Sequence, residues 1–377
     1  MHVGMFLDWY PEPGGLTSAV DGLARALAQL GGKVTIFAHG KRAEWTDAAD
    51  VTIRTFKRPA LGRYGRASPD LRSALRGNFY RLDLLVLAPV FSTCLPELAG
   101  AAREGDIPVI FAPHDPYHDA LFQHKRVKKQ IYFRLREQAL LNSADAVQVL
   151  APSHESWLRK RGIRTRVIVV PNGLDVAGDH TEQSTPAEPG RRASNGVTIG
   201  FLGRLAWWHK GLDILLQGFA AVRNDLPDLH LVLAGSPPSQ RDAEQISDLI
   251  EQLRLRDAVE VVGYVDREPA DVIAEWDILA CPSRFDGFPL TVLEAMAARR
   301  PILCSVEAGV WEYIQGAGCA VGVRPTAEGV ARGMHTIMER RSEWHHMGEL
   351  GRAHLEAHLT WNNAAAIALP LYQTMST

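Results

Sequence analysis

Two cations and two carboxylates in the second half of the chain have the types and the spacing to handle a phosphorylated substrate. Arg204 and Lys210 follow directly on the apolar run 197–203, and seven residues separate Asp286 from Glu294. A guanidinium grips phosphate oxygens in a bidentate fork, an ammonium adds a compact positive charge, and both stabilise a departing diphosphate. Taken alone, either cation is equally well explained as part of a solvated loop.

A pair of glycines near the start of the chain is a second candidate for binding phosphate. Gly14 and Gly15 lie between an expected strand at 2–8 and an expected helix at 18–30. Backbone amides and the helix dipole favour an anion at such a turn. The pattern is not G-x-G-x-x-G, which removes the main support for a dinucleotide-dependent oxidoreductase and leaves a plain strand-to-helix turn open.

Hydrophobic patterning predicts the elements that position these residues. Short buried runs alternate with amphipathic segments in two successive series, which is typical of an α/β fold with doubly wound parallel sheets. The first series has expected strands at 2–8, 33–38, 82–88, 108–112 and 144–150, with helices at 18–30 and 127–142. The second has strands at 197–203, 230–234, 259–262, 277–281 and 301–305, with helices at 212–222, 243–253 and 291–298. Ligands of such sheets bind outside the carboxyl ends of the strands, where Arg204 and Lys210 fall.

The segment 178–196 is the expected domain boundary. It is rich in Glu, Ser, Thr, Pro and Arg and nearly free of large apolar residues, and a chain of 377 residues suits two domains. We therefore expect an N-terminal Rossmann-like domain at 1–177 and a C-terminal one at 197–356, facing each other across a cleft. The residues 357–377 are expected to cross back onto the first domain, and closure about a hinge at 171–196 is expected to assemble the site.

Composition excludes several classes of protein. A formal net charge of −2 gives no general attraction to nucleic acid, so none is expected as a partner. The four cysteines show no C-x-x-C spacing, which favours a reducing, cytoplasmic setting. The N-terminal residues do not resemble a signal peptide, and the sequence has no stretch of about 18 apolar residues, so no membrane span is expected.

The spacing Asp286-x7-Glu294 is one of several motifs that occur in the order of a known family. The others are Gly14-Gly15, His114-Asp115, Ser143-Ala-Asp-Ala-Val147 leading to Ser153, Pro171-Asn-Gly-Leu-Asp175, Arg204 with Lys210, and Leu359-Thr-Trp361. Over nearly its whole length the chain resembles the retaining glycosyltransferases of the GT-B fold, the family-4-like "glycosyl transferases group 1", whose hallmark is Glu-x7-Glu. The resemblance implies transfer of a sugar from a nucleotide-sugar donor, with no cofactor.

The resemblance also implies roles for individual residues. The diphosphate would be met by cations and backbone amides, supplied by Gly14, Gly15, Arg204, Lys210, Leu290 and Thr291. The nucleoside would lie against the Glu294 carboxylate, which binds the ribose hydroxyls, and against the backbone near Val265. The donor sugar would lie near Asp286, Gly287 and Phe288, with His114 reaching across from the first domain. A strand-end histidine that only caps a turn is the alternative for His114.

Two departures from the family pattern bear on the donor sugar more than on the reaction. The first acidic position is Asp286, one methylene shorter than Glu, and Pro289 replaces a glycine and has no amide to donate. The sequence has no Asp-x-Asp triplet, so we expect cations in place of a metal clamp and no metal site. UDP is expected rather than GDP, and UDP-glucose rather than other UDP-sugars.

The acceptor leaves less trace in the sequence. A glycan, a lipid-linked glycan or a small molecule would fit, and the first domain is expected to receive it. Cations gather at 54–81 and 124–136, and the helix expected at 125–141, with Ile131, Phe133 and Leu135, could contact anionic lipid at the inner face of a membrane. Solvated cations, with apolar residues packed on the sheet, are the preferred interpretation.

Three rivals remain at this point. A catalytically inactive nucleotide-sugar sensor or scaffold is favoured by Asp286 and Pro289 in the loop that should hold the sugar. A phosphorylase or a sugar-phosphate synthase of the same fold is another, although a phosphorylase usually needs a longer chain and a cofactor lysine. A metal site at His345, His346, His354 and His358 is disfavoured, because the set lies on a polar helical pattern without the H-E-x-x-H order.

Overall fold

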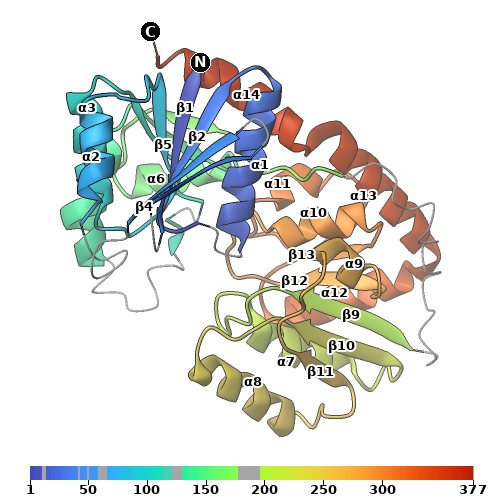
Figure 1. The fold of residues 1–377 in the computed structure, drawn as a ribbon. Coiled ribbons are helices and arrows are strands. Elements are labelled where there is room, and N and C mark those ends of the chain that lie inside the picture. The colour runs from blue at the N-terminus through green and yellow to red at the C-terminus, as the bar shows by residue number, and fades with distance from the viewer. Residues whose placement is uncertain are drawn as a thin grey trace. The chain divides into compact units, whose positions relative to one another are not determined.

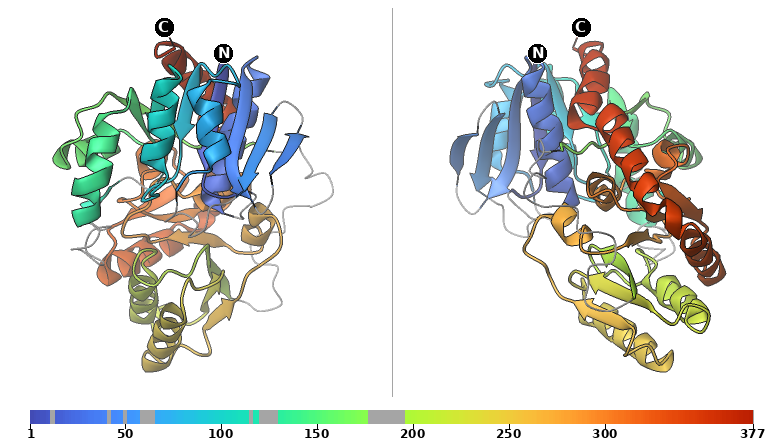
Figure 2. Two further views of the ribbon diagram at one scale, coloured as in Figure 1. Left: turned by 60° about the vertical axis from the view of Figure 1, so that its left-hand side comes forward. Right: turned by 90° about the vertical axis from the view of Figure 1, so that its right-hand side faces the viewer.

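A computed structural model describes residues 1–10, 14–40, 43–48, 51–57, 66–114, 117–119, 130–176 and 196–376. The chain forms two compact units (Figures 1 and 2). Unit 1 consists of Met1–Asp175 and Thr360–Thr377, and unit 2 of Val176–Leu359. The limits therefore fall at 175 and 360, against the expected 177 and 357. Nearly all of the expected linker 178–196 lies outside the described residues.

Unit 1 is built on an eight-stranded sheet of order β3-β4-β2-β1-β5-β6-β7-β8. Its strands are β1 (His2–Leu7), β2 (Lys33–Gly40), β3 (Glu44–Ala48), β4 (Val51–Lys57), β5 (Leu84–Leu87), β6 (Val109–Phe111), β7 (Ala146–Val149) and β8 (Val167–Val169). The helices α2 (Pro69–Arg76) and α3 (Leu95–Glu104) cover one face with a core that includes Phe6, Phe37 and Leu98. The helix α1 (Gly15–Gln29) lies on the other face (Figure 1).

The edge of this sheet differs from the expected all-parallel arrangement. Strand β3 was missing from the prediction and pairs antiparallel with β4, with Trp45 opposite Arg54. The Arg54 guanidinium lies 3.0 Å from the centroid of the Trp45 ring. Polar and charged residues on an exposed edge strand discourage pairing with another chain. The pattern of β3 is too polar to signal a buried strand, which explains why the prediction missed it.

The last helix, α14 (Trp361–Gln373), belongs to unit 1 and lies beside α1 (Figure 2). Thr360 caps it by accepting a hydrogen bond from the amide of Asn363. A Cβ atom at Gly22 of α1 would lie 2.2 Å from the Trp361 ring, so only glycine allows the two helices to approach this closely. The hydroxyl of Tyr372 donates to Gln148 of β7 at 2.5 Å.

The helix expected at 127–142 is only partly described, because residues 120–129 lie outside the described residues. Residues 133–137 form a π-helical turn, η3 (Phe133–Glu137), followed by α5 (Gln138–Asn142). Phe133 is buried as expected, but Ile131 and Leu135 are 52% and 72% exposed. The interpretation that the apolar residues of this helix pack onto the sheet is therefore wrong for these two.

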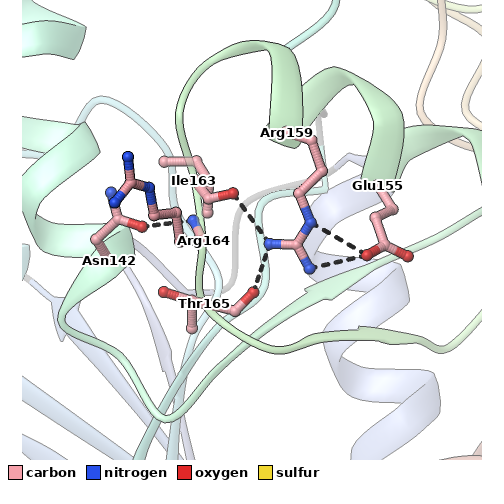
Figure 3. A network of polar contacts seen from close by, with 6 residues as sticks. All are labelled: Asn142, Glu155, Arg159, Ile163, Arg164 and Thr165. Carbon is pink, nitrogen blue, oxygen red and sulfur yellow. Dashed lines mark hydrogen bonds and ion pairs between the residues drawn. The ribbon is translucent and has the colours of Figure 1, made fainter.

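Polar contacts hold the end of unit 1 that follows α5. In helix α6 (Ser153–Lys160), Arg159 bonds Glu155 at 2.8 Å and also donates to the carbonyls of Ile163 and Thr165 (Figure 3). The amide of Arg164 donates to Asn142 at 2.7 Å. A surface hollow borders this loop and is lined by Gln138, Asn142, Ala144, Asp145, Gly162, Arg164, Thr165 and Arg166. It lies at the amino ends of β7 and β8, the edge of the sheet opposite to the one where α/β folds bind ligands.

Unit 2 has a six-stranded parallel sheet of order β11-β10-β9-β12-β13-β14. Its strands are β9 (Val197–Leu202), β10 (Leu229–Ala234), β11 (Val259–Val262), β12 (Ile278–Cys281), β13 (Ile302–Ser305) and β14 (Ala320–Val323). The helices α7 (Leu212–Val222), α8 (Gln240–Gln252) and α12 (Ala327–Glu339) share a core with it. The remaining ones are α9 (Pro269–Ile273), α10 (Leu290–Ala297), α11 (Trp311–Ile314), the 3-10 turn η5 (Arg341–Glu343) and α13 (Trp344–His358).

Both units thus confirm the predicted doubly wound α/β architecture. In each, the chain first builds the sheet in one direction from its first strand and then in the other, which puts helices on both faces. None of the helices in the described part of the chain is long and apolar enough to cross a membrane.

Candidate functional site

The strand order of unit 2 reverses between β9 and β12. From β9 the chain moves outward to β10 and β11, then returns to β12 and continues to β13 and β14. The loops that leave β9 and β12 diverge here toward opposite faces, and in open α/β sheets this is where ligands bind. Arg204 and Lys210 lie on the first loop and Asp286 on the second, so the predicted candidates meet at the switch point.

Lys210 and Asp286 form an ion pair. The Lys210 ammonium lies 2.5 Å from Asp286 Oδ2, and the Ser283 hydroxyl contacts the same oxygen at 3.4 Å. The two side chains are only 19% and 13% exposed. Burial works against both charges, but each partner outweighs it, which raises the pKa of Lys210 and lowers that of Asp286. The sequence analysis treated the cation and the carboxylate as separate parts of the site, and the structure joins them.

Arg204 differs from Lys210 because it is exposed. No ion pair or hydrogen bond to its side chain occurs within the described residues. It is nevertheless close enough to Lys210 for its charge to oppose protonation there. An exposed guanidinium beside a half-buried ammonium is a suitable site for an anion that arrives from solvent.

His209 is a member of this site that the sequence analysis missed. Its ring stacks on Phe285 at 4.2 Å between centroids, and its Nε2 is buried without a hydrogen-bond partner in the described part of the chain. Burial, aided by the charge of Lys210, lowers the pKa of His209 to about 4. The imidazole is therefore neutral at physiological pH. The sequence could have indicated this residue, because His209 directly precedes the predicted site residue Lys210 in Trp-Trp-His-Lys.

A second pair that sequence reasoning missed ties the two loops together. Arg284 grips Asp213 with both terminal nitrogens, at 2.7 and 2.6 Å. The same guanidinium donates to the carbonyl of Trp208 at 2.7 Å, and the Arg284 amide donates to the carbonyl of His209 at 3.1 Å. Gly211 allows this approach, because it adopts φ +68° and a Cβ there would lie 2.4 Å from the Pro282 carbonyl. The loops of Lys210 and Asp286 are thereby held in one arrangement.

The residues after Asp286 present backbone more than side chains. The carbonyl of Asp286 accepts from the amide of Gly309 at 2.9 Å, which holds the turn at Gly287. Phe288 was expected beside the donor sugar, but its side chain is 5% exposed and packs against Tyr313 with centroids 5.4 Å apart. Phe288 therefore presents its backbone, and not its ring, to a ligand.

Helix α10 begins directly after Pro289, whose extended backbone makes it the N-cap residue. The amides of Leu290 and Thr291 fall in the first turn, where helix amides have no partner within the helix and carry positive partial charge. Glu294 lies one turn further on and is half-buried. Burial first, and the charge of Glu268 second, raise the pKa of Glu294 to about 7. Val265 follows β11 and is half-buried too, next to the exposed ring of Tyr264.

The remaining candidates belong to unit 1. Gly14 is the N-cap residue of α1 and has φ +153°, and Gly15 begins the helix. Both are exposed, and a Cβ on either would meet nothing within 4 Å. His114 follows β6, burial lowers its pKa to about 4, and its Nδ1 is buried without a partner among the described residues. Asp115, its neighbour in the sequence motif, lies outside the described residues.

Metal-binding side chains do not gather in the described part of the chain. No group of three or more His, Cys, Asp or Glu side chains there could hold a metal ion. Of the late histidines, His354 is hydrogen-bonded through Nε2 to the carbonyl of Tyr313 at 2.9 Å, and its ring lies 4.8 Å from that of His358. This pairing explains their spacing on α13 by packing within unit 2.

Two units, each with a predominantly parallel sheet and flanking helices, define the GT-B architecture of glycosyltransferases. Two family models match the chain, "Glycosyltransferase Family 4" over residues 13–177 and "Glycosyl transferases group 1" over residues 186–354. Together they account for most of its length. The chain belongs to the glycosyltransferase family that these models describe.

Three similar proteins illustrate the range of the family. Mannosylfructose-phosphate synthase of Agrobacterium fabrum is 29% identical over 162 residues, which are 40% of this chain and 35% of that one. The chain thus matches about a third of that relative's length. Phosphatidyl-myo-inositol mannosyltransferase of Mycolicibacterium smegmatis is 24% identical over 390 residues, covering 100% of this chain and 94% of that one. The structure of Anabaena HepE in complex with UDP-glucose shares the fold with a TM-score of 0.75 at 19% identity, covering 98% and 99% of the two chains.

Proposed function

We propose that this protein transfers a sugar, with retention of configuration and without a metal ion, from a nucleotide-diphosphate sugar to a glycan or lipid-linked acceptor. UDP-glucose is the favoured donor over other UDP-sugars and over GDP-sugars. The observation that carries the proposal is the exposed Arg204 beside the Lys210–Asp286 pair at the β9–β12 switch point. The complex of HepE with UDP-glucose supports the choice of donor.

In this proposal the diphosphate of the donor binds at the carboxyl end of β9. Arg204 grips the phosphate oxygens, and Lys210 adds a second positive charge. The first amides of α10, at Leu290 and Thr291, contribute helix-terminal donors. The Glu294 carboxylate accepts hydrogen bonds from the ribose hydroxyls, and the base lies against the backbone near Val265. Gly14, Gly15 and His114 keep the roles that the family resemblance implies.

The chemical step needs opposite charges stabilised at once. When the bond from the anomeric carbon to the diphosphate breaks, positive charge develops on the sugar ring and negative charge on the leaving phosphate. Asp286, kept ionised by Lys210, offsets the first charge, and Arg204 with Lys210 offsets the second. The acceptor hydroxyl bonds to the anomeric carbon on the face that the phosphate leaves, and its proton passes to a phosphate oxygen. The products are the glycosylated acceptor and the nucleoside diphosphate.

A catalytically inactive sensor of nucleotide sugars is the second candidate. It is favoured by one observation, the direct bond between Asp286 and Lys210, because a carboxylate already neutralised by a neighbour offers less charge to a developing cation. The two candidates agree on donor binding and differ in turnover.

Calorimetric titration with UDP, GDP and ADP in the presence of EDTA tests both candidates. We expect UDP to bind the wild type and the Arg204→Ala/Lys210→Ala variant to lose at least 100-fold in affinity, about 2.7 kcal/mol. The Arg256→Ala variant, which removes an exposed arginine of the same unit, should bind like the wild type. Absence of binding by all three nucleotides would reject the site, and an activity that requires manganese would reject metal independence. Tight UDP binding without hydrolysis or transfer of UDP-glucose, across acceptors, would favour the sensor.

We also propose that unit 1 contacts an anionic membrane surface at the cytoplasmic face. The exposed side chains of Ile131 and Leu135 lie on one turn with the exposed cations Arg134 and Arg136. Apolar residues beside cations are typical of segments that lie on anionic lipid. Four free cysteines, all buried, accord with a reducing compartment. Co-sedimentation with phosphatidylglycerol vesicles should fall several-fold in Ile131→Ser/Leu135→Ser, and equal sedimentation of the two proteins would reject the contact.

A further inference from the structure

Unit 1 has a switch point of its own. The strand order reverses between β1 and β5, whose residues Phe6 and Leu87 are partners in the parallel register. Asp8 follows β1 directly, and the loop after β5 carries Phe91 and Ser92. By the same rule that locates the site in unit 2, the crevice outside these two strand ends is where unit 1 would bind a ligand.

Polar side chains from both strand ends meet at this point. The Ser92 hydroxyl donates to Asp8 Oδ1 at 2.8 Å, and Cys94 Sγ lies 3.2 Å from that hydroxyl and 3.7 Å from the same Asp8 oxygen. Asp8 is half-buried, whereas Ser92 and Cys94 are buried. Burial first, and Asp8 second, raise the pKa of Cys94 to about 12, so its thiol stays protonated. The cluster therefore consists of a carboxylate surrounded by neutral groups.

A buried carboxyl group lies directly beside this cluster. Glu137 ends the π-helical turn η3 and is 2% exposed, and its Oε1 accepts a hydrogen bond from the amide of Phe91 at 2.5 Å. The carboxyl also interacts with the hydroxyl of Tyr117. Its other oxygen, Oε2, is buried and has no hydrogen-bond partner among the residues that the structure describes. A buried polar atom left unpaired costs about 1–3 kcal/mol, which a ligand hydroxyl could recover.

The backbone at this point is held in an unusual conformation. Phe91 has φ +53°, which is rare for a residue with a side chain, and its ring lies 5.9 Å from the rings of both Tyr117 and Tyr132. Residues in such conformations collect at ligand sites, as do π-helical turns. The Tyr132 side chain is half-buried, and burial first and Glu137 second raise its pKa to about 12, so its hydroxyl stays protonated. Aromatic rings and hydroxyls thus border the two carboxyl groups.

We infer that the β1–β5 switch point of unit 1 binds a neutral polyhydroxyl ring of the acceptor, a sugar or a cyclitol, through Asp8 and Glu137. This inference rests on the proposed function for the meaning of acceptor. Both carboxyl groups accept hydrogen bonds from hydroxyl groups, and the negative charge of Asp8, joined above about pH 7 by that of Glu137, repels phosphates. The ring that binds here therefore carries no phosphate next to these two groups. Tyr132 and Phe91 supply the apolar surface against which the ring lies.

Saturation-transfer NMR on the whole protein tests this inference with glucose, myo-inositol and glucose 6-phosphate as probes, with and without UDP. We expect glucose or myo-inositol to bind and glucose 6-phosphate to bind at least fivefold more weakly. Asp8→Asn and Glu137→Leu should each weaken binding of the neutral ring at least fivefold. The control Asp106→Asn makes the same change as the first variant at an exposed position of unit 1 and should have no effect.

Thermal unfolding identifies any variant that does not fold. Such a variant is replaced by Ser92→Ala, which removes the hydrogen-bond partner of Asp8. Binding of neither neutral ring, equal binding by wild type and variants, or tighter binding of glucose 6-phosphate would each overturn the inference. Calorimetry with UDP keeps the two hypotheses apart, because a protein that binds UDP but no polyol rejects only the site in unit 1. A protein that binds the polyol but not UDP rejects the proposed donor site instead.

Discussion

The switch points of the two units have the same backbone plan and opposite chemistry. In unit 2 the strand ends carry Arg204 and Lys210 around one carboxylate, Asp286. In unit 1 they carry Asp8 with neutral hydroxyl and thiol groups, beside the buried carboxyl of Glu137. A doubly wound sheet fixes where a ligand binds, and the side chains at the strand ends decide which ligand it is. The cationic point suits a diphosphate, and the acidic one suits hydroxyl groups.

The two points also differ in how their loops are held. Unit 2 uses a charged fork, in which Arg284 joins Asp213 and the carbonyl of Trp208. Unit 1 uses the amide of Phe91, a residue at φ +53°, bonded to a buried carboxyl group. The first device is an ion pair with two parallel hydrogen bonds. The second depends on the protonation of Glu137, whose pKa burial raises to about 7.

The largest effect should come from removing the carboxylate of the cationic switch point. Asp286→Asn keeps the shape of the side chain but removes the charge that offsets the developing cation on the sugar. We expect kcat for UDP-glucose turnover to fall about 10²–10³-fold, the size seen when one charge-stabilising group is lost. The affinity for UDP should not fall, because the substitution releases Lys210 from its partner. Steady-state kinetics and calorimetry measure the two quantities.

The control for this change is Asp257→Asn, the same substitution at an exposed aspartate of unit 2 that pairs with Arg223. It should leave both kcat and UDP affinity within twofold of the wild type. An Asp286→Asn enzyme with unchanged kcat would remove Asp286 from the mechanism. The ion pair of Lys210 and Asp286 would then have a structural role only.

The acidic switch point should show itself in the pH dependence of stability. Because the pKa of Glu137 is higher in the folded protein than in the unfolded chain, the folded state binds more protons between pH 4.5 and about 7. The wild type should therefore lose stability as pH rises through this interval, by about 2–3 kcal/mol from this group. Glu137→Gln removes that contribution. Urea unfolding at pH 5 and pH 8 measures the free energy of unfolding of both proteins. The value of the variant relative to that of the wild type should be higher at pH 8 than at pH 5.

The same comparison with Glu104→Gln, an exposed glutamate of unit 1, separates this effect from general charge effects. Glu104→Gln should follow the wild type at both pH values. If the free energies of unfolding of Glu137→Gln and the wild type differed by the same amount at pH 5 and pH 8, Glu137 would already be ionised in the folded protein across this range. The contrast between the two switch points would then be one of charge sign alone.

A smaller effect is expected from the fork that holds the loops of unit 2. Arg284→Lys keeps the charge but cannot bond Asp213 with two parallel hydrogen bonds. We expect kcat/KM for UDP-glucose to fall about tenfold, mainly through kcat, because the loop of Asp286 is held less firmly. Arg223→Lys at the surface pair with Asp257 is the matched control and should change nothing. A purely structural role would lower the melting temperature and leave kcat unchanged.

The sequence predicted the strands of both units well because buried parallel strands are short apolar runs bounded by turns. It also predicted that Arg204, Lys210 and Asp286 belong to one site, because each follows a strand of the same series. Four strands escaped: β3, β4, β8 and β14. Glu44 and Asp47 give β3 no apolar period, and β8 and β14 have only three and four residues. The long helix at 127–142 was expected without the π-helical turn that brings Glu137 under Phe91, because periodicity does not distinguish α- from π-turns.

The partners of the site residues could not be predicted at all. The bonds of Lys210 to Asp286 and of Arg284 to Asp213 join residues 76 and 71 positions apart, and only the packing of two loops creates them. His209 and Glu137 escaped for a related reason, because their chemistry comes from burial and not from residue type. Whether Phe288 offers its ring or its backbone was likewise decided by Tyr313, a residue in another element.

The smallest effect should come from the second carboxyl group of the cationic switch point. Burial and the charge of Glu268 raise the pKa of Glu294 to about 7, so a ribose contact that needs the carboxylate should weaken as pH falls below this value. We expect the affinity for UDP to drop a few-fold between pH 7.5 and pH 5.5. Glu268→Gln removes the like charge, lowers the pKa of Glu294 and should move the midpoint of this drop to lower pH by less than one unit. Glu251→Gln, at an exposed glutamate of α8, should leave the midpoint in place, and calorimetry across the pH range measures all three proteins. A UDP affinity independent of pH in the wild type would mean that Glu294 binds the ribose equally well when protonated. Glu294 would then bind hydroxyl groups without needing a charge, as a protonated Glu137 would in unit 1.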